Sequence, residues 1–171
     1  GHYPFLVRDI VAPDVTLPVL REPLDRTVSI LRQLQQGHRR MGGRPLEEIY
    51  DDPWLRATMI RDFQVKQFAI TQADLEGQAA QVAAFRGLER PELPDKPHLF
   101  GLAMDDQRLE LAKANLAQVE EVGLLEDFGA FLDRLRSTYD WAVEEEHHQR
   151  SGAHDLEVPP SLLERIAEDL R

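Results

Sequence analysis

The chain contains no cysteine and no long apolar run, and these two absences set the first limits on its class. Without cysteine it has neither a disulfide framework nor a cysteine-bound metal, a composition that fits the reducing cytoplasm. No apolar run approaches the roughly 20 residues that cross a bilayer. The sequence therefore predicts a globular cytoplasmic protein without a membrane span.

Positive charge is scarce beside negative charge. Lys and Arg number 20 against 31 Asp and Glu, which gives a net charge of −11 and argues against general binding to nucleic acid. Residues 1–66 carry ten Lys or Arg and nine Asp or Glu, whereas residues 67–171 carry ten and twenty-two. An anionic ligand is therefore expected in the first part, and solvated helix faces in the acidic remainder.

The length of 171 residues suits one domain with its own core. Apolar periodicity and turn signals predict strands near 15–20 and 119–125, and helices at 22–36, 46–52, 54–70, 105–118, 127–139 and 161–170. The last helix has Ser161 and Glu164 at the spacing of a capping box. Residues 71–98 are harder to assign, and residues 144–160 form a polar linker.

The segment Leu20–Ser29 carries the chemistry that is easiest to interpret. Pro23 suits the first helical position, where its missing N–H group would have no partner in any case. Arg21 offers a planar fork of donors that matches a phosphate, and Ser29 adds a hydroxyl donor. An Arg at the end of a strand and a Ser two turns into the next helix can hold one anion. An ordinary strand-turn-helix with a surface Arg and a solvated Ser has the same spacing.

Four stretches together resemble the sulfotransferases that act on carbohydrates. Gly1–Phe5 resembles their Gly-His-x-Pro-[Phe/Tyr] element, and Leu20–Ser29 resembles their 3′-phosphate segment Arg-[Asp/Glu]-Pro-x-x-Arg-x-x-Ser. Asp62–Phe68 is similar to a helical Asn-x-Gln-x-[Arg/Lys]-x-[Leu/Phe] stretch. Leu109–Asp127 resembles Leu-Ala-x-x-Asn-Leu followed by Val-Gly-[Leu/Val]-x-Glu. The order of the four stretches also matches that family.

The resemblance implies a fold, a reaction and two donor ligands. The fold is an α/β fold of the P-loop-like, three-layer α/β/α type, helix-rich and with a parallel sheet, over a single domain 1–171. The reaction moves a sulfuryl group from 3′-phosphoadenosine-5′-phosphosulfate to a hydroxyl of a carbohydrate and leaves adenosine 3′,5′-bisphosphate. By the same resemblance, Arg21 and Ser29 hold the 3′-phosphate, and no metal is implied.

Two further roles rest on the resemblance. His2 matches the catalytic base, which takes the proton of the acceptor hydroxyl as its oxygen attacks sulfur. A reference pKa of about 6.5 suits an imidazole for this step, although a terminal residue without a role is the alternative. The family places a mobile loop with a basic side chain near residue 150. Arg150 is the only Lys or Arg between Arg136 and Arg165, so it is the candidate, with a solvated linker as the alternative.

One family motif is missing. Sulfotransferases place a Pro-Lys-[Ser/Thr]-Gly-[Ser/Thr]-Thr-type loop, which wraps the 5′-phosphosulfate, ahead of the 3′-phosphate segment. Here the first Lys is Lys66, and the loop would precede Gly1. We therefore interpret the chain as the C-terminal portion of a longer domain. The alternative function is a non-catalytic, helix-rich protein-interaction module on the same scaffold, with acidic helices for a basic partner.

Other basic residues have competing interpretations. Arg26 lies four residues after Glu22, the spacing of an ordinary surface ion pair. The Gly-rich basic loop 37–45 would contact an anionic glycan or the donor nucleotide, or it is a solvated turn.

The sequence also contains two adjacent histidines and two tryptophans, whose functional signals are less specific. His147 and His148 are adjacent, so on a helix they diverge by about 100° and make poor joint metal ligands. Trp54 and Trp141 are interpreted as core or rim residues rather than platforms for sugar stacking.

Overall fold

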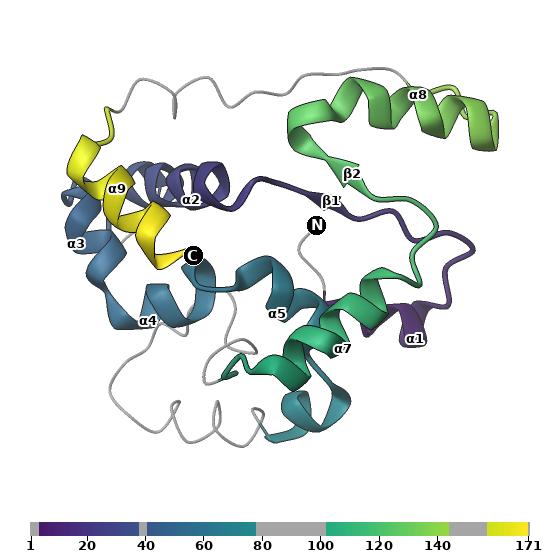
Figure 1. Cartoon of the computed structure of the whole chain (residues 1–171), viewed down its shortest axis with the longest axis horizontal. Helices are drawn as coiled ribbons and strands as arrows, with labels where there is room; N and C mark the ends of the chain where they lie inside the picture. Colours follow the sequence, from purple (N-terminus) through teal and green to yellow (C-terminus); the bar gives the residue numbers. More distant parts are fainter. Residues whose placement is uncertain (1–3, 38–40, 78–101, 144–156, 171) are drawn as a thin grey trace. The chain divides into compact units, whose positions relative to one another are not determined.

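The computed structural model of the chain describes residues 4–37, 41–77, 102–143 and 157–170 (Figure 1). The chain divides into two compact units, each made of two separated stretches. The first unit comprises residues 1–16 and 51–120, and the second comprises residues 17–50 and 121–171. The described part is rich in helix and contains a two-stranded parallel sheet, which confirms the predicted combination of helices with parallel strands. Within the described ranges no helix has the length and apolar character that a bilayer crossing needs.

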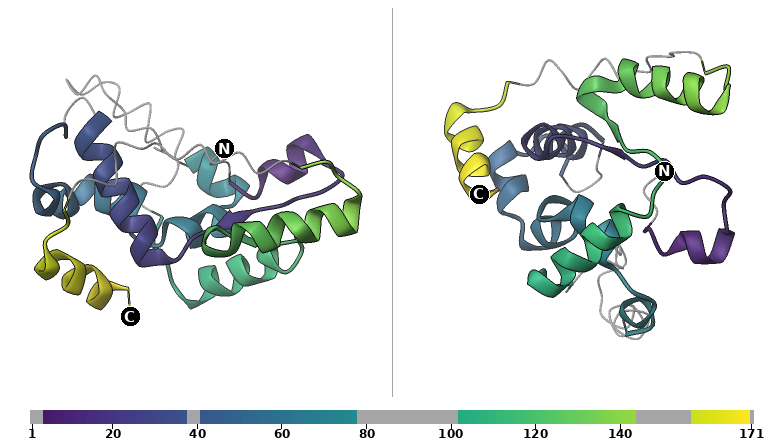
Figure 2. Two further views of the ribbon diagram at one scale, coloured as in Figure 1. Left: turned by 90° about the horizontal axis from the view of Figure 1, so that it is seen from above. Right: turned by 45° about the vertical axis from the view of Figure 1, so that its right-hand side comes forward.

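The regular structure in the described residues of the first unit is helical. Its helices are α1 Val7–Val11, α4 Pro53–Leu55, the π-helix η1 Arg56–Ile60, α5 Phe63–Ala69 and α7 Asp106–Leu116, and residues 72–77 are helical as well. Figures 1 and 2 show α5 and α7 side by side, and their contact is the main packing interface of this unit.

The predicted continuous helix over 54–70 is wrong, because the chain changes helix type and then turns. The Asp52 carboxylate caps α4 by accepting from the backbone N–H groups of Trp54 and Leu55, each at 3.0 Å. After η1 the backbone of Asp62 is left-handed, with φ 53°, a conformation that Asp tolerates better than most residues. The apolar pattern runs through this break and hides it.

Burial of α5 on almost every side organises the first unit. Its buried residues are Phe63, Lys66, Gln67, Phe68 and Ala69. A helix leaves its last four carbonyl groups without partners inside the helix, and burial makes unsatisfied carbonyls costly. Here each of the four accepts a hydrogen bond: Lys66 O from Ile70 N at 3.1 Å, Gln67 O from Phe5 N at 2.8 Å, Phe68 O from Asn115 Nδ2 at 2.7 Å, and Ala69 O from Arg108 Nη1 at 2.8 Å.

Arg108 also forms a two-pronged ion pair with Asp74. Its Nη1 and Nη2 donate to Asp74 Oδ2 and Oδ1, both at 2.6 Å, and Thr71 donates to the same carboxylate through its backbone N–H and its hydroxyl. Burial alone would raise the pKa of Asp74, but the hydrogen bonds from Arg108 and Thr71 outweigh it and the net pKa is lowered. The folded state therefore prefers the charged carboxylate.

The Asp74 pair makes stability depend on pH. Asp74→Asn is expected to lower the free energy of unfolding by about 1–3 kcal/mol at pH 7. A pKa lowered in the folded state gives stability that is present above the unfolded value of about 3.9 and lost as the pH falls through the folded value. The difference between the variant and the original chain, measured by urea unfolding at pH 7, 5 and 3, should thus shrink on acidification. Glu121→Gln, which removes a more exposed partner of Arg134, is the control and should cost about 0–1 kcal/mol.

The second unit combines the sheet with longer helices. Its elements are β1 Val19–Leu20, α2 Pro23–Gly37, α3 Leu46–Asp51, β2 Gly123–Leu124, the 3-10 helix η3 Leu125–Asp127, α8 Phe128–Tyr139 and α9 Pro160–Asp169. The strands are parallel, with Val19 opposite Gly123 and Leu20 opposite Leu124. Helix α2 starts at Pro23, as predicted.

Both strands are shorter than predicted. Pro18 has no N–H group for a ladder, although its carbonyl accepts from Gly123 N at 2.9 Å. Farther upstream, Thr16 N donates to the carboxylate of Glu120 at 2.8 Å rather than to a strand. The paired region is therefore confined to two residues on each side.

The capping box predicted at Ser161 is wrong. Helix α9 already begins at Pro160, and its N-cap residue Pro159 makes no side-chain capping bond. Pro is favoured at the first helical position because it has no N–H to leave unsatisfied, so the helix starts one residue early and Ser161 lies inside it. The far end of α9 is fixed by Asp169, whose Oδ2 accepts from Tyr50 Oη at 2.6 Å.

Gly123 brings strand β2 and helix α8 into close contact. A Cβ atom at this position would lie 2.8–3.0 Å from ring atoms of Phe131, and Phe131 is itself a core residue of α8 with Leu132 and Leu135. The absent side chain therefore sets the distance between the helix and the strand.

Gly123→Ala is expected to lower the free energy of unfolding by about 1–3 kcal/mol, because the Phe131 ring must shift. Gly129 provides a matched control, since nothing lies within 4 Å of an added Cβ there and it sits inside α8. Gly129→Ala should raise stability by about 0.5–1 kcal/mol. Equal effects of the two variants in chemical unfolding would contradict this account of Gly123.

Candidate functional site

The candidate site lies where the two parallel strands end. Arg21 directly follows β1, and Glu126 lies two residues beyond β2. Parallel strands have their carboxyl ends at the same edge of a sheet, the edge where α/β folds usually bind ligands. The charge of Arg21 contributes to lowering the pKa of Glu126, so the two side chains are electrostatic neighbours.

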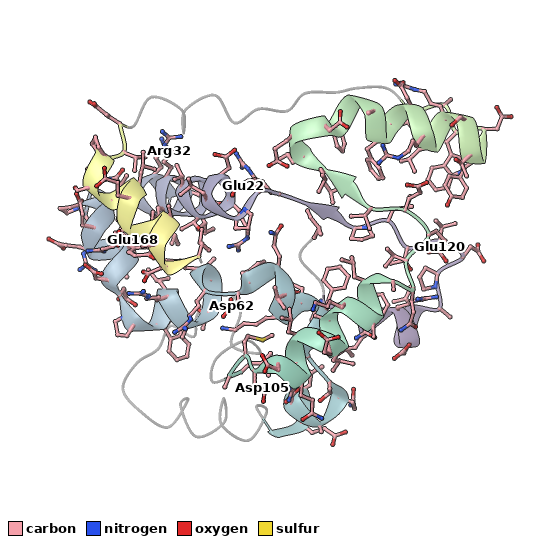
Figure 3. All side chains as sticks on the ribbon, in the orientation of Figure 1. Glu22, Arg32, Asp62, Asp105, Glu120 and Glu168 are labelled. Carbon is pink, nitrogen blue, oxygen red and sulfur yellow. The ribbon has the colours of Figure 1, made fainter. Side chains whose placement is uncertain are left out.

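Two carboxylates fix the start of α2 behind Arg21. Glu126 Oε1 accepts from Glu22 N at 2.8 Å, and Glu22 Oε2 accepts from Asp25 N at 2.8 Å. Figure 3 labels Glu22 at this end of α2. The backbone N–H groups of Glu22 and Asp25 are therefore occupied within the chain.

Arg26 joins Arg21 at the site. Burial first, and then the charge of Arg21, lower the pKa of Arg26 to about 10. Arg26 is thus more enclosed than the surface ion pair expected from its spacing to Glu22. Because each guanidinium raises the energy of the other, a bound anion placed between them would relieve the repulsion.

Ser29 is a half-buried residue of α2, three residues after Arg26. This spacing places the two side chains on neighbouring parts of the helix surface, away from the buried residues Thr27, Val28, Leu31 and Leu34. Among the described residues none hydrogen-bonds to the Ser29 hydroxyl, so the structure positions it beside Arg26 but does not join it to Arg21.

Several predicted residues lie outside the described ranges. They are His2, Arg39, Arg40, His147, His148 and Arg150. Within the part of the chain that the structure describes, no cluster of three or more His, Cys, Asp or Glu side chains could hold a metal ion. Arg44, from the basic loop, pairs with Glu48 at 3.1 Å.

The two tryptophans lie near the surface rather than in the core. Trp141 is exposed, and its ring stacks on Tyr139 with 4.9 Å between centroids. Trp54 is half-buried in α4. The interpretation as rim residues fits both positions.

Three residues with structural or chemical importance were not singled out from the sequence. Glu126 was noted only as part of a motif, although that motif marked its position after the second strand. Lys66 and Gln67 are buried, and Lys66 Nζ donates to Ala57 O at 2.8 Å. Burial is the first cause that lowers the pKa of Lys66. Both residues lie in the Asp62–Phe68 stretch, where Lys66 takes the [Arg/Lys] position of the motif, but neither was given a role from the sequence.

Comparisons with known proteins give no relative. No family model, no curated protein and no solved structure matches this chain.

The electrostatic effect of Arg21 on Glu126 can be measured by NMR titration of carboxyl carbons. Hydrogen bonds from Glu22 N and from its own backbone N–H, followed by the charge of Arg21, lower the pKa of Glu126. Arg21→Ala should raise that pKa and leave the pKa of Glu120 unchanged. Glu120 is the matched control, because its pKa is lowered by bonds from Thr16 N and its own N–H and by the charge of Arg8. Arg8→Ala should have the reverse effect, and an unaltered Glu126 pKa in Arg21→Ala would remove Arg21 from this site.

Proposed function

We propose that this protein is a sulfotransferase that uses 3′-phosphoadenosine-5′-phosphosulfate and acts on a hydroxyl of a carbohydrate. The observation that carries the proposal is the pair of neighbouring arginines, Arg21 and Arg26, where strand β1 passes into helix α2. A phosphate dianion can accept hydrogen bonds from two guanidinium groups at once. Such charge-assisted hydrogen bonds are strong and geometrically specific.

The 3′-phosphate of the donor is held by side chains in this proposal. Arg21 donates from the end of β1, and the Ser29 hydroxyl donates from the α2 surface. Arg26 adds a second positive charge between them in sequence. Glu126 and Glu22 keep the backbone of this turn in place through their bonds to Glu22 N and Asp25 N, so the arginine is presented from a fixed start of the helix.

His2 performs the acid–base step in this proposal. Its neutral imidazole accepts the proton of the acceptor hydroxyl while that oxygen forms a bond to sulfur. The bond between sulfur and the phosphate oxygen breaks, and adenosine 3′,5′-bisphosphate leaves with the electron pair. Arg150 is assigned to cover the donor.

The finer fold belongs to the same proposal: a P-loop-like, three-layer α/β/α arrangement with a parallel sheet. Parallel sheets are normally covered on both faces, and an isolated two-stranded sheet is marginal in water. Val19 is 44% exposed and Leu124 is 50% exposed in the present sheet. Further parallel strands and covering helices would account for these apolar residues.

A second function, a non-catalytic protein-interaction module, is favoured by a different observation. The Glu126 carboxylate already stands beside Arg21 and takes a backbone donor of the turn. In that case the charge of Arg21 stabilises the Glu126 carboxylate within the fold, and the acidic helix surfaces bind a basic partner protein. Binding of the nucleotide decides between the two functions.

Calorimetric titration with adenosine 3′,5′-bisphosphate tests the proposed function, using this chain and a form extended upstream of Gly1. Arg21→Ala should weaken binding by about 1.5–3 kcal/mol, the range for a hydrogen bond to a charged group, and Ser29→Ala by about 0.5–1.5 kcal/mol. Arg134→Ala removes the same charge from α8, where Arg134 pairs with Glu121, and should leave the affinity unchanged.

Two results would reject the enzyme. One is a folded, extended protein that does not bind the nucleotide. The other is an equal loss of affinity in Arg21→Ala and Arg134→Ala, which would indicate attraction by overall charge alone.

A further inference from the structure

Trp141 carries an exposed aromatic ring just beyond the end of α8. The residue is 42% exposed, although tryptophan is largely buried in most folded proteins. Its indole stacks on the ring of Tyr139, with 4.9 Å between the centroids and 29° between the ring planes. Tyr139 therefore covers one face of the indole, and a large part of Trp141 nevertheless remains accessible to a ligand.

The turn that carries Trp141 is held by hydrogen bonds within the second unit. Asp140, left-handed with φ 53°, donates from its backbone N–H to Arg136 O at 3.1 Å and so caps α8. Val143 N donates to Trp141 O at 2.9 Å, and Arg136 Nε and Nη2 donate to Val143 O at 3.0 and 2.7 Å. Tyr139 and Val143 also pack on the buried core of α8. The ring is thus positioned before any ligand binds, which lowers the entropic cost of binding.

Trp141 is separated from the exposed apolar residues at the end of the sheet. Leu124 and Leu125 precede α8, whereas Trp141 follows it, and Figure 1 shows β2 and the last turn of α8 at opposite ends of this helix. The twelve residues of α8 place about 18 Å between its two ends. The exposed chain neighbours Thr138 and Asp140 are polar. A stable protein interface needs about 800 Å² on each partner, so this single ring suits a smaller, partly polar ligand.

The charges around the turn favour a neutral ligand. The guanidinium of Arg136 is already engaged, because it donates to Asp133 Oδ1 at 2.7 Å and to Val143 O. Asp140 adds an exposed carboxylate next to Trp141. An anionic ligand would be repelled by this carboxylate, whereas a hydroxyl group could donate a hydrogen bond to it.

A sugar ring combines the two properties that this surface requires. A pyranose with equatorial hydroxyl groups has flat faces of C–H groups and a polar rim. The C–H face can stack on the indole and remove apolar area from water. The hydroxyl groups of the rim can donate to a carboxylate and accept from neighbouring donors.

We propose that the Trp141 ring is a stacking platform for one sugar unit of a neutral oligosaccharide acceptor with equatorial hydroxyl groups. This inference rests on the proposed function, which supplies a carbohydrate as the substrate. Because α8 lies between Trp141 and the proposed donor site at Arg21 and Glu126, the platform binds a sugar unit other than the one that reacts. The acceptor is therefore a chain of sugars. Its fixed, exposed ring gives Trp141 the role of a platform, which the sequence did not favour.

Tryptophan fluorescence measures the environment of the platform directly. The chain has two tryptophans, so Trp54→Phe leaves Trp141 as the only indole. This variant is titrated with cellohexaose, a β-linked glucose chain, and with D-sorbitol as a flexible polyol control. The emission maximum should shift saturably to shorter wavelength with cellohexaose, because the stacked sugar excludes water, and not with sorbitol. In Trp141→Phe, which retains Trp54 alone, the emission should stay unchanged.

If Trp54→Phe does not fold, the original chain is labelled with 5-fluorotryptophan. Its two ¹⁹F signals are assigned with Trp141→Phe, and only the signal of Trp141 should move on addition of cellohexaose.

Calorimetry supplies the affinity of cellohexaose for each variant. Trp141→Ala should weaken binding about tenfold, and Trp141→Phe less, because Phe keeps a flat but smaller ring. Leu170→Ala is the matched control. Leu170, at the end of α9, is 43% exposed, so this variant removes an equally exposed apolar side chain elsewhere and should keep the affinity.

The failures of the two proposals are distinguishable. Cellohexaose binding that needs Trp141, without any binding of adenosine 3′,5′-bisphosphate, would reject the sulfotransferase and keep the sugar platform. Nucleotide binding without a saturable change at Trp141 would overturn the platform alone. Equal affinities of Trp141→Ala and the original chain for cellohexaose would also overturn it. An emission shift that follows protein concentration instead of cellohexaose would indicate that a second copy covers Trp141, and would likewise overturn it.

Discussion

The first unit depends on the requirement that the buried end of α5 has a partner for every carbonyl. A helix of this length has little stability of its own, so its formation relies on the groups that surround it. Its last carbonyls receive their bonds from Phe5, Asn115 and Arg108, which lie far apart in the sequence. The start of the unit, α5 and α7 must therefore assemble together. Arg108 extends this arrangement to Asp74 and so ties in the segment that follows α5.

Residues in the motifs that resemble a sulfotransferase also stabilise the fold of this chain. Phe5 and Asn115, from two of these motifs, both donate to the end of α5. Gly123 allows α8 to approach β2, and Glu126 holds the turn after β1. These residues therefore contribute to packing and backbone support within each unit, whatever their chemistry. Because these residues have structural roles, they do not distinguish the proposed enzyme from a non-catalytic module, and the test of the proposed function is made at Arg21 and Ser29.

Local signals predicted the elements whose ends are defined by nearby residues. Pro23 marks the start of α2, and Asp105 caps α7 by accepting from Arg108 N at 2.8 Å. The turn at Asp62 could not be predicted, because the apolar residues on both sides continue the same helical period. The exposure of the Trp141 ring depends on how the chain turns after α8, and no spacing in the sequence carries that information. The same is true of Glu126, whose partner Glu22 lies more than a hundred residues away.

Under the proposed function, the charges at the end of the sheet would determine how tightly a phosphate binds there. Glu126 and an incoming dianion both interact favourably with Arg21, so they compete for it. The Glu126 carboxylate also accepts a hydrogen bond from Glu22 N. It can keep that hydrogen bond while the Arg21 side chain turns to a ligand. The guanidinium of Arg26, whose pKa is lowered by burial and then by the charge of Arg21, would also be stabilised by an added negative charge. A dianion that contacts both arginines would interact with two positive charges, whereas a monoanion at Arg21 alone would interact with one.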